Sequence, residues 1–169
     1  QLNHNGGQAG SEYSRRPVWS ASNTTDPLFG ETAKAIDQAD IEELIAFYAT
    51  SAVYGKEGGF DGIEFQGSHS SILRQFLSPL TNHRQDAYGG SLENRFRLVK
   101  EVAAAVREAI GPEMALGIRL SGEEYTDGGL TLEDTVEIAK LVEACGYFDY
   151  INVSVGIATH NLFLVEGPM

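Results

Sequence analysis

Hydrophobic residues recur every three or four positions in three separate stretches of the chain. The stretches span residues 37–56, 94–110 and 131–145. This spacing places apolar side chains along one side of an α-helix, so each stretch predicts a helix with one buried face. Asp37 or Asp40 can accept hydrogen bonds from the first free amides of the first helix.

Each predicted helix is followed by a run of apolar residues that is short enough for a β-strand. These runs lie at residues 60–65, 115–120 and 148–155. We interpret them as apolar throughout rather than alternating, which is typical of parallel strands covered on both faces. The helix-then-strand order therefore predicts the α/β class, as a doubly wound sheet or a (β/α)₈ barrel.

The loops after the predicted strands favour the barrel. Loops 66–81 and 121–130 are long and polar, and in a (β/α)₈ barrel such loops form the active face. We expect residues 1–36 to be a strand stub followed by another long loop, and residues 37–169 to be helix/strand repeats. A complete barrel takes about 250 residues, so a partial barrel of about four strands out of eight is predicted, cut at both ends and inactive alone.

Turn and cap residues support the same boundaries. Thr131 with Asp134 three positions later forms a variant capping box, which opens the third predicted helix. Glycine follows each predicted helix, at Gly58 and Gly59, at Gly111 and at Gly146, where it can adopt the left-handed conformation that ends a helix.

Composition narrows the classes of partner. Acidic residues outnumber basic ones by 24 to 12, giving a formal net charge of -12. Nucleic acid and anionic lipid are bound through clustered Lys and Arg, so a small-molecule substrate is expected instead. No apolar run or leader predicts a membrane span or secretion, and a cytoplasmic location is expected. The single cysteine, Cys145, is expected to pack in the core.

Arg119 is the first candidate for chemistry, because it lies at the carboxyl end of a predicted strand. An unpaired guanidinium is costly to bury there and needs an anionic or carbonyl partner. The partner is either an acid on a neighbouring loop or the electron-rich edge of a bound ring, which the planar fork of arginine suits.

Gln66 and His69 lie three residues apart where the predicted strand 60–65 ends. In a barrel this position points into the mouth, although a Gln and a His in a polar loop are also often merely solvated. Both side chains can hydrogen-bond a ligand, and only His69 titrates near neutral pH.

The remaining motifs predict no other cofactor site. The four histidines are scattered, and no HExxH, CxxC, Rossmann or Walker pattern occurs, so no metal is expected. The cysteines of an iron–sulfur cluster are absent. His160 follows the last predicted strand and faces either a pocket or solvent.

A long stretch of the chain resembles the Old Yellow Enzyme family, also called the NADH:flavin oxidoreductase family. It reads GFDGIEFQGSHSSILRQFLSPLTNHRQDAYGGSLENR, followed by GIRLS, and the first residues QLNHNGGQAG resemble a strand end of the same family. The resemblance is strong over residues 37–156. Within it, residues 84–95 are expected to form a structural corner in which Ser91 caps a helix.

The resemblance implies FMN as cofactor, with NADH or NADPH as a possible reductant. It places Arg119 and Gln1 at the pyrimidine edge of the flavin, and Gln66 and His69 over the ring as the catalytic pair that hydrogen-bonds the substrate. Hydride transfer through flavin N5 in an ene-reductase or dienoyl reductase is the activity it implies.

Three departures from the family pattern leave the branch open. Gln66 replaces a residue that is usually His or Tyr, Gly7 replaces an arginine, and Ser71 stands where many ene-reductases carry a proton-donating tyrosine. The amine-dehydrogenase branch also lacks that tyrosine and reads GAHSYL where this chain reads GSHSSI. An amine dehydrogenase or N-demethylase, and an inactive barrel fragment with a structural role, are therefore the alternatives.

Overall fold

Three long helices occupy the stretches that helical periodicity predicts. The computed structural model describes residues 1–12, 14–27 and 30–157. Within these, α1 spans Gln38–Glu57, α3 spans Leu92–Ile110 and α4 spans Leu132–Cys145. Asp37 caps α1 and Thr131 caps α4, each through a capping box, which confirms both predicted helix starts.

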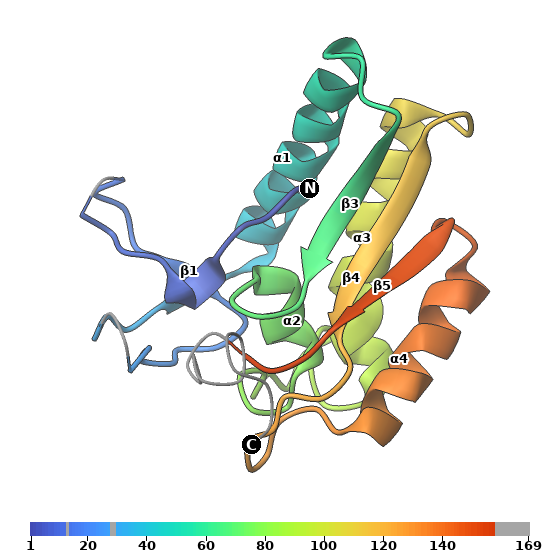
Figure 1. The fold of residues 1–169 in the computed structure, drawn as a ribbon. Coiled ribbons are helices and arrows are strands. Elements are labelled where there is room, and N and C mark those ends of the chain that lie inside the picture. The colour runs from blue at the N-terminus through green and yellow to red at the C-terminus, as the bar shows by residue number, and fades with distance from the viewer. Residues whose placement is uncertain (13, 28–29, 158–169) are drawn as a thin grey trace.

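Three parallel strands alternate with these helices and form one sheet. They are β3 (Gly62–Gly67), β4 (Ala115–Ser121) and β5 (Tyr150–Ser154), in the order β3-β4-β5. Both pairings are parallel. The predicted α/β class with a parallel sheet is confirmed (Figure 1).

The first residues of the chain add a further parallel segment beside β3. Leu2 pairs with Phe65 as an isolated parallel bridge. The Leu2 amide donates to the carbonyl of Glu64 at 2.8 Å, and the Gln66 amide donates to the carbonyl of Leu2 at 2.9 Å. Consequently Gln1 lies next to the carboxyl half of β3.

The two faces of the sheet differ in character. Phe65 points toward α1 and packs edge-to-face on Tyr48, with ring centroids 5.4 Å apart. Side chains alternate along a strand, so Glu64 and Gln66 point to the opposite face. Figure 1 shows α1, α3 and α4 together on one side of the sheet and the other side open. The interpretation of these strands as apolar throughout was therefore wrong for the open face, where Arg119 also lies.

Several short elements were not predicted. They are a 3₁₀ turn (η1, Gly6–Gln8), a parallel pair of two-residue strands (β1, Trp19–Ser20, and β2, Lys34–Ala35) and α2 (Ile72–Leu77). All six residues of α2 are buried, so no polar face marks its helical period. Gln75 of α2 ties it to the N-terminal region, because its Oε1 accepts from the Gly7 amide and the Ser20 hydroxyl at 3.0 and 2.9 Å.

β4 begins at Ala115 as predicted, whereas β3 and β5 each begin two residues later than predicted. Phe60 is exposed and precedes β3, whereas Gln66 belongs to the strand rather than to the loop. The shift matters for the site, because it fixes the backbone of Gln66 in the sheet next to β4.

Candidate functional site

Three polar side chains share one level of the open sheet face. Gln66 of β3 pairs with Arg119 of β4, and Arg119 pairs with Asn152 of β5. Paired residues in adjacent parallel strands point to the same face, so these side chains form a row across the carboxyl ends of the strands. Ligands bind at such strand ends in α/β proteins.

A single carboxylate, that of Glu64, lies beneath this row and contacts two of its members, Arg119 and Asn152. Its Oε1 is 3.4 Å from Nε of Arg119, and its Oε2 accepts from Nδ2 of Asn152 at 3.1 Å. Nε2 of Gln1 also donates to Oε1 of Glu64. Sequence reasoning missed Glu64, although an acid inside the otherwise apolar run GIEF was a signal that could have found it.

Arg119 has the acidic partner that its position requires, on a neighbouring strand rather than on a loop. The contact is an ion pair without good hydrogen-bond geometry, since Nε of Arg119 is buried and makes no hydrogen bond. The side chain is 34% exposed, against 14% for Glu64. Among the described residues no other partner holds the guanidinium, which leaves donors for a ligand.

His69 lies close to Arg119 and has a constrained backbone. Its φ is 53°, in the left-handed region that non-glycine residues seldom adopt. Burial lowers the pKa of His69 below its ordinary value, and the positive charges of Arg119 and Arg74 lower the pKa further. The imidazole is therefore neutral near pH 7, and its buried Nδ1 makes no hydrogen bond.

Arg74 anchors the loop that carries His69. Nε of Arg74 donates to the backbone carbonyl of His69 at 2.9 Å, and Nη1 lies 3.4 Å from Oε1 of Glu124. The other carboxylate oxygen, Oε2, accepts from the Ser78 hydroxyl at 2.8 Å and from the Leu130 amide at 3.0 Å. This pair is fully buried, and it joins the loop after β3 to the loop after β4.

Ser71 has a structural position. It is the N-cap of α2, where its Oγ accepts from the Arg74 amide at 3.1 Å, and its side chain is fully buried. The Ser68 hydroxyl donates to Oε1 of Gln66 at 3.2 Å, so the amide nitrogen of Gln66 remains as its outward donor. Position 7 leaves little room for a larger residue, since a Cβ on Gly7 would lie 3.1 Å from that of Ala33.

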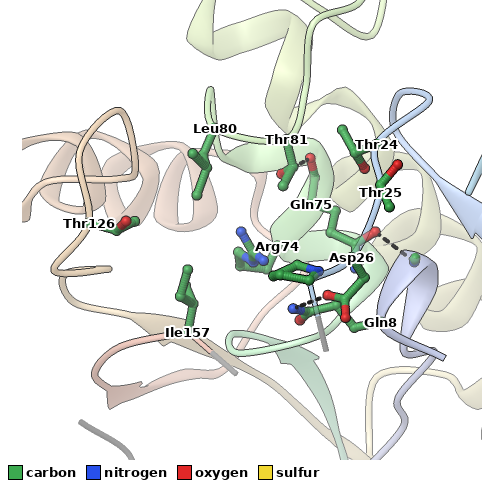
Figure 2. Close-up of a pocket in the computed structure, with 12 residues that line it drawn as sticks. Gln8, Thr24, Thr25, Asp26, Arg74, Gln75, Leu80, Thr81, Thr126 and Ile157 are labelled. Carbon is green, nitrogen blue, oxygen red and sulfur yellow. Dashed lines mark hydrogen bonds between the residues drawn. The ribbon is translucent and has the colours of Figure 1, made fainter. Parts of the chain in front are cut away.

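A cavity of about 430 Å³ lies beside the loop that carries His69, between α2, the N-terminal region and the loop after β4. Figure 2 shows Arg74 in the middle of its lining, with Gln8 and Asp26 to one side and Leu80 and Thr126 to the other. Nε2 of Gln8 donates to Oδ2 of Asp26 at 2.9 Å. The cavity belongs to the same end of the sheet as His69.

Other candidates from the sequence have structural roles or lie elsewhere. Residues 84–95 form a corner in which Arg84 donates to two backbone carbonyls of the N-terminal region, and Ser91 caps α3. Cys145 is half-buried and packs against the core. Within the described part of the chain, no cluster of His, Cys, Asp and Glu could hold a metal, and no helix could span a membrane. His160 lies outside the described residues.

Comparison with known proteins identifies the family of this chain. The model of the NADH:flavin oxidoreductase / NADH oxidase family matches residues 1–158. The chain belongs to this family. The predicted resemblance to the Old Yellow Enzyme group is thus confirmed.

Relatives in the family carry different activities in their names. The chain is 40% identical to the N,N-dimethylglycine/sarcosine dehydrogenase of Chromohalobacter salexigens over 84% of this chain and 21% of that protein. It is 39% identical to an NADPH dehydrogenase of Clostridium acetobutylicum, over 99% of this chain and 49% of that protein. Among solved structures, a 2-naphthoyl-CoA reductase complex matches 94% of this chain and 26% of its own, with a TM-score of 0.88 and 27% identity. The chain spans half or less of the length of these relatives.

The residues at the row fit one edge of a flavin ring. The pyrimidine edge of a flavin presents carbonyl oxygens and an unprotonated ring nitrogen, which accept hydrogen bonds, and one ring N–H, which donates a hydrogen bond. Arg119 and Gln1 meet at Glu64 and so reach the same place, and the buried Nε of Arg119 and Nδ1 of His69 are without hydrogen-bond partners. Unpaired buried polar atoms are costly, so these two atoms mark unmet hydrogen-bonding capacity at this end of the sheet.

Proposed function

We propose that the full-length protein is an FMN-dependent oxidoreductase acting on a small unsaturated molecule, as an ene-reductase or dienoyl reductase with NADH or NADPH as reductant. The observation that carries the proposal is the open row of Gln66 and Arg119 beside His69, whose guanidinium and imidazole retain free hydrogen-bonding capacity. Membership of the NADH:flavin oxidoreductase family supports it.

Arg119 and Gln1 are the proposed cofactor-binding residues. Arg119 donates to the pyrimidine edge and places a positive charge where negative charge grows on reduction. Gln1, anchored on Glu64 through its amide nitrogen, directs its remaining carbonyl toward the same edge. When bound, FMN supplies the reversible acceptance and delivery of a hydride.

His69 and Gln66 are the proposed substrate-orienting pair. A neutral imidazole donates from one nitrogen and accepts at the other, so His69 can bind either a carbonyl or an amine. Gln66 can donate from its amide nitrogen and cannot titrate. Arg74 holds the His69 backbone, which fixes the direction of the imidazole.

An amine dehydrogenase or N-demethylase is the second candidate, and Ser71 is the observation that favours it. Reduction of an activated alkene requires a proton at the carbon next to the acceptor group, and the buried capping hydroxyl of Ser71 is poorly placed to supply one. Oxidation of an amine needs no such donor. The similarity to an N,N-dimethylglycine/sarcosine dehydrogenase supports the same branch.

The structural context we propose is a partial (β/α)₈ barrel of about four strands, completed by further sequence of the full-length protein. The segment at Leu2 and strands β3 to β5 supply four parallel segments in order. Val153 of β5 is 64% exposed, as expected for a strand whose covering element lies outside this chain. A barrel piece that only serves as a structural module is the remaining alternative.

Anaerobic reduction of the purified full-length protein tests these proposals. Bound FMN that is bleached by NADH or NADPH, and recovered by an activated alkene, is expected for the first candidate. Bleaching by N,N-dimethylglycine or sarcosine without nicotinamide indicates the second. A protein that retains no flavin would contradict both and favour the structural module.

A further inference from the structure

We propose that Glu64 is a positioning residue that holds Arg119 and Gln1 at the flavin edge and sets how much positive charge the flavin experiences. The inference rests on the proposed function, because it concerns the same ring-binding face. It assigns a role to a carboxylate that would otherwise be only an acid inside a strand.

The location of Glu64 suits this role. It lies one position before the bridge residue Phe65 and two before Gln66, so its side chain shares the open face with the row. Its carboxylate meets three donors from three neighbouring segments, namely Gln1, Arg119 and Asn152.

The Glu64 side chain is also sufficiently shielded from solvent for its charge to influence neighbouring groups. Glu64 is 14% exposed, so its charge is screened less than that of a surface acid. The Tyr150 hydroxyl lies in its field, since burial and then the negative charge of Glu64 raise the pKa of Tyr150. The carboxylate thus acts on Tyr150 as well as on the groups that it contacts directly.

Two effects of Glu64 on a bound ring follow, and they have different signatures. As an anchor it fixes the guanidinium of Arg119, which increases affinity for the ring. As a counter-charge, Glu64 offsets part of the positive charge of Arg119. The reduced, anionic flavin is then stabilised less than it would be by Arg119 alone, so the midpoint potential is lower. Glu64→Gln removes the charge and preserves the size of the side chain. Measuring both FMN affinity and midpoint potential then separates the anchoring effect from the counter-charge effect.

The test uses the full-length protein with Glu64→Gln, Arg119→Ala and the double variant, measuring the FMN dissociation constant and the midpoint potential. Glu64→Gln should raise the potential, whereas Arg119→Ala should lower it. Glu64→Gln should weaken FMN binding on the order of tenfold in the natural background and by less in the Arg119→Ala background, where only the contact with Gln1 is left to lose.

Asp149→Asn is the matched control. It removes the same charge from an ion pair with Arg107 at the opposite end of the strands, where Nη2 lies 2.7 Å from Oδ2. This control should leave both flavin measurements unchanged. If Glu64→Gln does not fold, Glu64→Asp replaces it in the test. Aspartate keeps the charge on a shorter side chain, so FMN affinity should fall while the flavin midpoint potential stays near the natural value.

The outcomes separate this inference from the proposed function. A natural protein that binds no FMN overturns the proposed function and this inference with it. A natural protein that binds FMN, combined with Glu64 variants whose affinity and potential match it, overturns the role of Glu64 alone.

Discussion

Two arginine–glutamate pairs in this protein have the same separation and opposite surroundings. In both Arg74–Glu124 and Arg119–Glu64 the closest nitrogen–oxygen distance is 3.4 Å. The side chains of the first pair are 2% and 0% exposed, and those of the second are 34% and 14% exposed. Distance alone therefore does not distinguish a pair that builds the fold from one that can serve a ligand.

The remaining hydrogen-bonding capacity makes the distinction. The second carboxylate oxygen of Glu124 accepts hydrogen bonds from Ser78 and Leu130, and Nε of Arg74 donates to the carbonyl of His69. Around Arg119 the contact with Glu64 is an ion pair, and Nε of Arg119 makes no hydrogen bond. The buried pair therefore fixes two loops, whereas the half-exposed pair is suited to meet a bound ring.

Loss of the buried carboxylate should have the largest effect on stability. Glu124→Ala leaves the charge of Arg74 buried without its ion-pair partner, which costs about 3–5 kcal/mol of unfolding free energy. Glu64→Ala should cost only on the order of 1 kcal/mol, because Arg119 can still be hydrated. Urea unfolding of the two variants measures the contrast, and equal losses would remove the distinction between the pairs.

Loss of His69 should have the largest effect on turnover. His69→Ala removes the positioned imidazole and should lower kcat/KM on the order of 10²-fold, the lower end for a group of this kind. Ser71→Ala should change kcat/KM little and cost about 1 kcal/mol of stability as a lost N-cap. Steady-state kinetics and unfolding curves decide the point. A Ser71 variant more damaged in turnover than the His69 variant would mean that the hydroxyl acts in catalysis.

Loss of the half-exposed guanidinium should alter the flavin more than the fold. Arg119→Ala removes a charge-assisted donor and should weaken FMN retention on the order of tenfold while lowering the flavin midpoint potential. Equilibrium dialysis and reductive titration measure the two effects. An unchanged potential would exclude Arg119 from the pyrimidine edge.

Acidification should produce the smallest effect, through the half-buried histidines His4 and His69. Burial lowers the pKa of His4 and His69 below the ordinary 6.5, so the unfolded chain binds more protons than the folded chain as pH falls below that value. Stability is therefore present in full above about pH 6.5 and declines below it. Urea unfolding at pH 7.5 and pH 5.5 should show the decline, and His69→Ala should make it shallower; a flat profile would argue against a neutral His69 in the folded state.

Local sequence signals determined most of the scaffold. The helical periodicity of α1, α3 and α4, together with the capping residues Asp37 and Thr131, marked their positions. These signals are local, because a helix satisfies its own backbone within four residues and needs only one apolar face.

Tertiary structure decided how the polar residues meet. The sequence singled out Gln1, Gln66, His69 and Arg119 as separate strand-end residues. Two of them, Gln1 and Arg119, meet at Glu64, which lies 63 and 55 positions away, and Asn152 reaches the same carboxylate from 88 positions away. The register of parallel strands sets that meeting, and no local pattern encodes register. The same reason hides Arg74 and Glu124, which are 50 positions apart and pair only because the two loops pack together.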